Sequence, residues 1–206
     1  MTKLELFSVL IVLLLSISCS FTGVMSFDAP TSIGNYEYPY GVYIPSNFTI
    51  PAGNVYKFKL YSGGFVWHKC NTTSGKWGID QFRSVYFNRK EDLFLYPSSA
   101  VAALDFRAGG VTIRSVIPKN DTSIMNVNVV NTSPSANPAK DYTYELLLAS
   151  NNTGEGALKD ITYFILTEPN GGAPPPDKDC GSTYPNGYIY STDFTATMIY
   201  FHPGSS

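Results

Sequence analysis

Apolar and polar residues alternate along most of this chain, with the two-residue period of a half-buried β-strand. The alternation is clearest over residues 56–60, 125–129 and 194–200. Two nearly continuous apolar runs, 144–149 and 161–166, are typical of central strands. No stretch sustains the 3.6-residue period of an amphipathic helix. The pattern therefore predicts an all-β protein.

Turn signals divide this pattern into short strands. Further strand-like segments are 64–69, 82–87, 92–96, 101–106 and 111–117. Glycine-containing turn signals occur at 62–64, 108–110, 154–156, 170–172 and 186–187. Loops are expected at 131–141 and 168–186. About ten strands with this spacing predict a single antiparallel β-sandwich or barrel, and no repeat or linker divides residues 27–206.

The chain begins with features of a secretory leader. Lys3 precedes an apolar run over residues 6–17, and small residues suited to cleavage follow at 18–20 and 24–26. We interpret residues 1–26 as a signal peptide with room for a short pro-segment. The run is short for a membrane span, and no later segment approaches that length. The mature protein is expected to be secreted, extracellular or wall-associated, without a membrane contact.

Five N-glycosylation sequons follow the leader, and none has proline at its central position. Their acceptor residues are Asn47, Asn71, Asn120, Asn131 and Asn151. One such pattern arises easily by chance, but five after a leader predict a glycoprotein. Sugars at several separate places would leave less bare surface for a broad substrate cleft.

Removal of the leader also removes Cys19 and leaves two cysteines, Cys70 and Cys180. An oxidising compartment favours a disulfide between them. The alternative is a nucleophilic Cys70 assisted by His68, because residues two apart on a strand point to the same face.

Groups able to support catalysis are scarce. The net charge is −2, so no basic patch indicates nucleic acid as a partner. His68 and His202 are the two histidines, and no set of zinc ligands, nucleophile elbow or dinucleotide-binding fingerprint is present. We therefore expect no catalytic residue, metal or cofactor. A glycan hydrolase would need two facing carboxylates, which the sequence cannot place; the candidates include Glu91, Asp92, Glu145, Glu155 and Asp160.

The aromatic residues say more about a possible function than the scarce catalytic groups do. Four tyrosines crowd one short segment, and two tryptophans flank Cys70; these six residues are Tyr36, Tyr38, Tyr40, Tyr43, Trp67 and Trp77. Exposed rings of this kind can stack on sugars or become cross-linked in a wall. Ordinary packing in half-buried positions is the other interpretation.

The C-terminal half carries a run of motifs that resembles a secreted family catalogued as a domain of unknown function. The run consists of an apolar strand at 146–150, Gly154-x-Gly156, a second strand at 160–165, Gly171-Gly172-Ala173-Pro174, Cys180 and a closing strand at 190–201. Upstream, Gly63-Gly64 and Cys70 look like that family's first glycine-rich strand and cysteine. Val66 and His68 depart from the pattern, in which Gln and Tyr are usual.

This resemblance implies a β-rich domain and supports a Cys70–Cys180 disulfide. Fungal members are often labelled malate dehydrogenase, an activity for which this chain has no cofactor motif. The leader, sequons and low charge are also similar to the slime-mould spherulins, which are encystment glycoproteins. We therefore expect a non-enzymatic structural component of a wall, coat or matrix, in a dormant or encysted stage. Wall polysaccharide or matrix proteins would be its partners, and a carbohydrate-binding module is the alternative.

Overall fold

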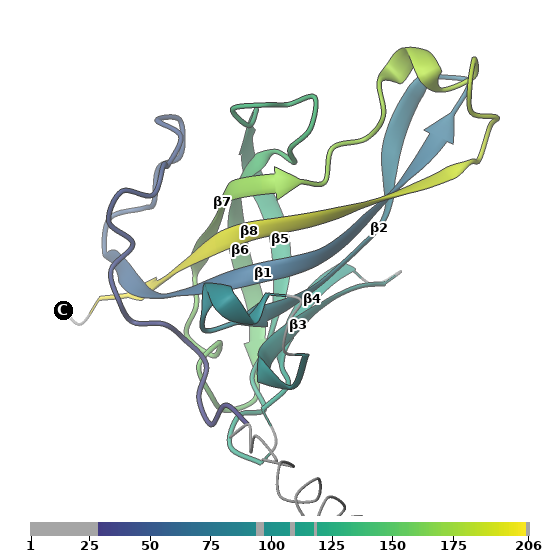
Figure 1. The fold of residues 1–206 in the computed structure, drawn as a ribbon. Helices are drawn as coiled ribbons and strands as arrows, with labels where there is room; N and C mark the ends of the chain where they lie inside the picture. Colours follow the sequence, from purple (N-terminus) through teal and green to yellow (C-terminus); the bar gives the residue numbers. More distant parts are fainter. Residues whose placement is uncertain (1–28, 94–96, 108–109, 118, 205–206) are drawn as a thin grey trace, which may run out of the picture.

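The chain folds into a closed barrel of eight antiparallel strands (Figure 1). Each strand is hydrogen-bonded to the next along the chain, and the last strand pairs with the first. The computed structural model describes residues 29–93, 97–107, 110–117 and 119–204, so the predicted leader lies outside the described residues. The all-β prediction is confirmed, and the architecture is a barrel.

The longest connection between consecutive strands is residues 172–188, before the last strand. Their bounds are β1 (Asn54–Asn71), β2 (Lys76–Phe87), β3 (Ala100–Arg107), β4 (Gly110–Ser115), β5 (Ile124–Ser133), β6 (Tyr144–Thr153), β7 (Tyr163–Gly171) and β8 (Ile189–Pro203). Three single-turn 3-10 helices are η1 (Lys90–Asp92), η2 (Pro97–Ser99) and η3 (Asp177–Asp179). Among the described residues, no helix has the length and apolar character of a membrane span.

The structure has eight strands instead of the expected ten, and part of this difference arises because two predicted strands form one. The segments 56–60 and 64–69 both belong to β1, which passes straight through the predicted turn at 62–64. Gly64 allows close contact with β2, because a Cβ there would lie 2.0 Å from the Arg83 carbonyl oxygen. The predicted strand at 92–96 lies partly outside the described residues, and Asp92 itself ends η1.

Alternate residues of each strand point into the barrel, and one end of the interior is sealed. Ile33, Ile117, Leu158 and Ile161 come from the segments at this end and are no more than 5 % exposed. The same core cluster includes three aromatic residues whose rings pack together: Phe58 from β1, Phe164 from β7 and Tyr200 from β8. The sealed end is a packed core that leaves only the opposite end open.

The segment that precedes β1 covers part of the outer wall. Phe48 and Ile50 pack against Tyr144, Leu146 and Ile165 on the outside of β6 and β7. These two strands are therefore apolar on both faces, which explains the continuous apolar runs in their sequences.

Three strands extend beyond the barrel as an arm (Figure 1). The arm comprises residues 65–71 of β1, 76–82 of β2 and 189–193 of β8, because β3 pairs only with residues 83–87 and β7 only with residues 194–201. Within the arm, β1 lies between β2 and β8. η3 and the loop before β8 lie against its far end.

Candidate functional site

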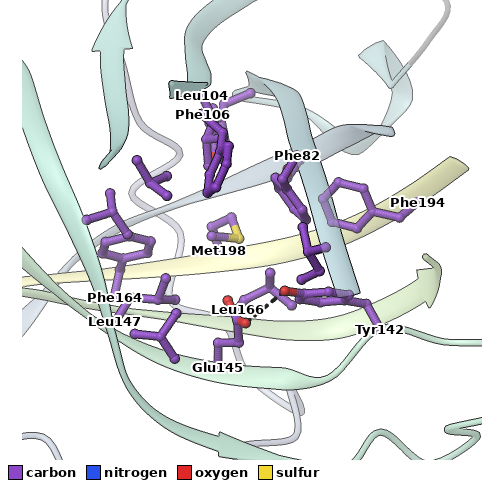
Figure 2. Close-up of a pocket in the computed structure, with 16 residues that line it drawn as sticks. Phe82, Leu104, Phe106, Tyr142, Glu145, Leu147, Phe164, Leu166, Phe194 and Met198 are labelled. Carbon is purple, nitrogen blue, oxygen red and sulfur yellow. Dashed lines mark hydrogen bonds between the residues drawn. The ribbon is translucent and has the colours of Figure 1, made fainter. Parts of the chain in front are cut away.

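An apolar cavity occupies the unsealed half of the barrel (Figure 2). Its volume is about 220 Å³, and all eight strands contribute to its wall. Ile79, Phe106 and Val129 line the outer part of the cavity and are 48 %, 38 % and 53 % exposed, which marks the rim. The cavity is thus open to solvent at the end where β2, β4, β6 and β8 begin.

The register of β6, β7 and β8 fixes the inner wall. Leu147 of β6 is paired with Phe164 of β7, and Leu166 of β7 is paired with Met198 of β8. Directly paired residues of an antiparallel sheet share a face, so all four side chains point inward (Figure 2). Glu145 is paired with Leu166 and therefore points inward as well.

Glu145 is the charged residue of this wall. Its carboxyl Oε1 accepts a hydrogen bond of 2.9 Å from the Tyr142 hydroxyl, and the residue is only 9 % exposed. Burial raises the pKa of the Glu145 carboxyl to about 7, and the hydrogen bond from Tyr142 opposes that rise. Burial also raises the pKa of the Tyr142 hydroxyl, as does the neighbouring Glu145. Near neutral pH this carboxyl can therefore either donate a proton or carry a charge.

Two further hydroxyl groups lie among the lining residues. Ser62 on β1 is 1 % exposed, and its Oγ has no hydrogen-bond partner in the part of the chain that the structure describes. Tyr86 on β2 is equally buried, and that burial raises the pKa of its hydroxyl while Ser84 lowers it. A buried hydroxyl without a partner is uncommon in folded proteins. Ser62 is therefore available to a polar atom inside the cavity.

The cavity does not bring two carboxylates together. Of the residues that the structure describes, Glu145 is the one acidic residue that lines it, whereas a glycosidase mechanism uses a facing pair. Within the described ranges, no group of three or more His, Cys, Asp or Glu residues is placed to hold a metal ion. The chemistry of the site is that of an apolar chamber with one titratable carboxyl group.

The predicted disulfide is present. Cys70 at the end of β1 is bonded to Cys180 after η3, with their Cα atoms 5.4 Å apart. Cys70 therefore has no free thiol to act as a nucleophile. His68 is buried nearby, its Nε2 lies 3.0 Å from the Gly172 carbonyl oxygen, and burial lowers its pKa.

The four clustered tyrosines separate into small groups on the surface. Tyr40 is 85 % exposed and lies beside Tyr38, with ring centroids 4.8 Å apart. Tyr36 packs edge-on against Phe58, and Tyr43 packs against Tyr144. No single binding platform is built from all four rings.

The two tryptophans lie on opposite faces of the arm. Trp77 is paired with Cys70, contacts Tyr184 and Tyr190, and donates a hydrogen bond to the Pro176 carbonyl, so it packs over the disulfide region. Trp67 points to the other face and lies 5.9 Å from Phe65 between ring centroids. The spacing around Cys70 therefore does not place the two indoles in one site.

The five sequon asparagines all reach the surface to some extent. Asn47, Asn71, Asn120 and Asn151 are exposed, and Asn131 is half-buried. The side-chain amide of Asn131 donates to the Asn47 carbonyl, and the Oδ1 of Asn71 accepts a hydrogen bond from the Thr73 backbone N–H. Glycosylation at these positions stays a prediction.

The sequence alone left Glu145 among several carboxylates whose positions it could not determine. One signal distinguished it: Glu145 is the single charged residue within the apolar run 144–149. A lone charge inside a buried strand identifies a polar group that faces a core or a cavity. Tyr142 and Ser62 had no comparable signal, because their roles depend on how the barrel closes.

Comparisons with protein-family models, characterised proteins and solved structures gave no match to this chain. The cavity and its chemistry are therefore the basis for a function.

Proposed function

We propose that this protein binds a small apolar molecule inside its barrel. The observation that carries the proposal is the preformed cavity of about 220 Å³, with an apolar wall and an open rim. An eight-stranded barrel has an interior just wide enough to be filled by side chains or to hold one small ligand. Here one half is filled and the other half is hollow.

The contrast between the two halves supports a binding role. Packed interiors contain few voids larger than a water molecule, because lost contacts destabilise the fold. A ligand would restore those contacts to Leu147, Phe164 and Met198 and remove their apolar surface from water. A few polar groups in an otherwise apolar chamber are typical of small-molecule sites.

Calorimetric titration with propylbenzene tests this proposal. We expect saturable binding of one molecule per chain. Val127→Phe would fill the cavity, since Val127 lines it, and should weaken binding by at least about tenfold. Val130→Phe is the matched control, because Val130 lies on the same strand and is 54 % exposed. Absence of saturable binding, or equal binding by both variants, would refute the proposal.

A second candidate function uses the outward face of the arm. Phe65 and Trp67 on β1 are flanked by Asp193 and Ser191 of β8 and by Gln81 of β2, all paired to them in register. Aromatic rings beside hydrogen-bonding side chains suit contact with sugar rings. Sedimentation with insoluble polysaccharides should show binding that Trp67→Ala abolishes and Val130→Ala retains. Equal sedimentation of both variants would exclude this face.

We also retain, as a proposal from the sequence, a secreted and glycosylated protein of a wall, coat or matrix. The exposed rings of Tyr38 and Tyr40 support it, because they are accessible to cross-linking. Retention in the insoluble wall fraction of the producing cells would agree with it, and free recovery from the medium would count against it.

A further inference from the structure

Among the described residues, the cavity contains a negative group but no positive one. Its described lining includes Glu145, Tyr142 and Tyr86 as titratable residues, and no Lys, Arg or His. A ligand carboxylate would thus meet a second carboxyl group and no cation. A ligand cation would meet a carboxylate that has no ionic partner in the cavity.

Glu145 is also short of hydrogen-bond donors. Across the described residues, the Tyr142 hydroxyl is the donor that reaches its carboxyl group. Charged carboxylates inside proteins are normally paired or accept several hydrogen bonds, because desolvation of an isolated charge is costly. The site is therefore incomplete as a binding site for charge, and an ammonium group would complete it.

Aromatic rings line the cavity on several sides. Phe82 lies 5.6 Å from Tyr142 and 4.8 Å from Phe194 between ring centroids, and Phe106 and Phe164 stand on other parts of the wall (Figure 2). Aromatic rings accept both another ring and a cation as neighbours. This wall therefore suits a ligand that carries both an aromatic ring and a positive charge.

The volume sets the size of the ligand. An apolar protein cavity of about 150 Å³ binds benzene, which has six heavy atoms. By proportion, about 220 Å³ corresponds to roughly nine heavy atoms, or one ring with a short side chain.

We propose that the ligand is a small aromatic amine, with its ring against the apolar wall and its ammonium group paired with the Glu145 carboxylate. This inference rests on the proposed function, because it assigns a ligand class to the same cavity. Ser62 supplies a second polar contact to a ligand that carries a hydroxyl group. Glu145 acts as the specificity-determining residue.

Competitive titration at pH 8 tests the inference with three probes of matched shape: 2-phenylethylamine, 2-phenylethanol and propylbenzene. We expect the amine to bind wild-type protein at least about tenfold more tightly than the alcohol. Glu145→Gln keeps the size and the acceptor for Tyr142 but removes the charge. It should erase the preference for the amine while saturable propylbenzene binding persists, which also shows that the variant is folded.

Glu91→Gln is the control for loss of one surface charge, because Glu91 is exposed and is not among the lining residues. It should keep the wild-type preference. If propylbenzene binds but the amine has no advantage, or if Glu145→Gln keeps that advantage, the amine assignment is wrong and the binding function stands. If none of the three probes binds, the proposed function itself is wrong.

Discussion

Replacement of Glu145 by glutamine should change how the stability of the barrel depends on pH. In the unfolded chain this carboxyl ionises near its ordinary pKa of 4.5, whereas burial holds the pKa near 7 in the folded protein. Between these two values the folded state keeps a proton that the unfolded state has lost. The free energy of unfolding of the wild type therefore falls as pH rises through this window.

The magnitude follows from the two pKa values. At about 1.4 kcal/mol for each pH unit, an interval from 4.5 to about 7 corresponds to about 3 kcal/mol. Glutamine does not titrate, so Glu145→Gln should gain about 3 kcal/mol relative to wild type between pH 4 and pH 8. All other titrating groups are shared and cancel in the difference.

Urea denaturation followed by tryptophan fluorescence, at half-unit steps from pH 4 to pH 8, measures this difference. Glu91→Gln provides the comparison for an exposed carboxyl group. A constant difference between wild type and Glu145→Gln across the range would refute the assigned environment of Glu145. Tyr142→Phe removes the hydrogen bond that lowers the pKa, so in that variant the loss of stability should extend to higher pH.

Three further predictions concern the disulfide, a close contact between two strands and the sequons. Removing the disulfide by replacing Cys70 and Cys180 with serine should cost up to about 4–5 kcal/mol, measured by urea denaturation against the oxidised wild type; an unchanged midpoint would contradict it. Gly64→Ala should destabilise the fold by about 2 kcal/mol or more, since a Cβ would collide with a carbonyl of β2, whereas Gly78→Ala has open space and should be tolerated in the same assay. Mass spectrometry of sequon peptides should find Asn47 and Asn131 less occupied than Asn71, because the side-chain amides of Asn47 and Asn131 each donate a hydrogen bond to a backbone carbonyl; equal occupancy would contradict this.

Local patterns located most of the strands because each strand's alternation reports its own burial. The runs 101–106, 111–117 and 125–129 all fall largely within single strands. The turn predicted at Gly63-Gly64 was wrong, because glycine can mark either a turn or a close contact between two strands. The contact with Arg83 that decides between them is not local in sequence.

The choice between a sandwich and a barrel could not be made from the sequence. Both architectures use the same alternating strands, and they differ here in whether β1 pairs with β8. That pairing joins segments such as Leu60 and Met198, which lie far apart along the chain. The cavity depends on this closure, so the surroundings of Glu145 could not be predicted from the sequence either. The sequence did show that Glu145 is the single charged residue of an apolar run.

Closure through β1 and β8 has a consequence for the order in which the protein is made. β1 cannot complete its pairing before β8 is made, because the edge of β1 that pairs with β8 has no partner strand until residues 189–203 have been synthesised. The disulfide of Cys70 likewise cannot form until Cys180 has been synthesised. Contacts between such distant segments slow folding, since a long loop must close first. Until the final strand has formed, an extended edge of β1 is open to pairing with other strands, and the cavity does not exist.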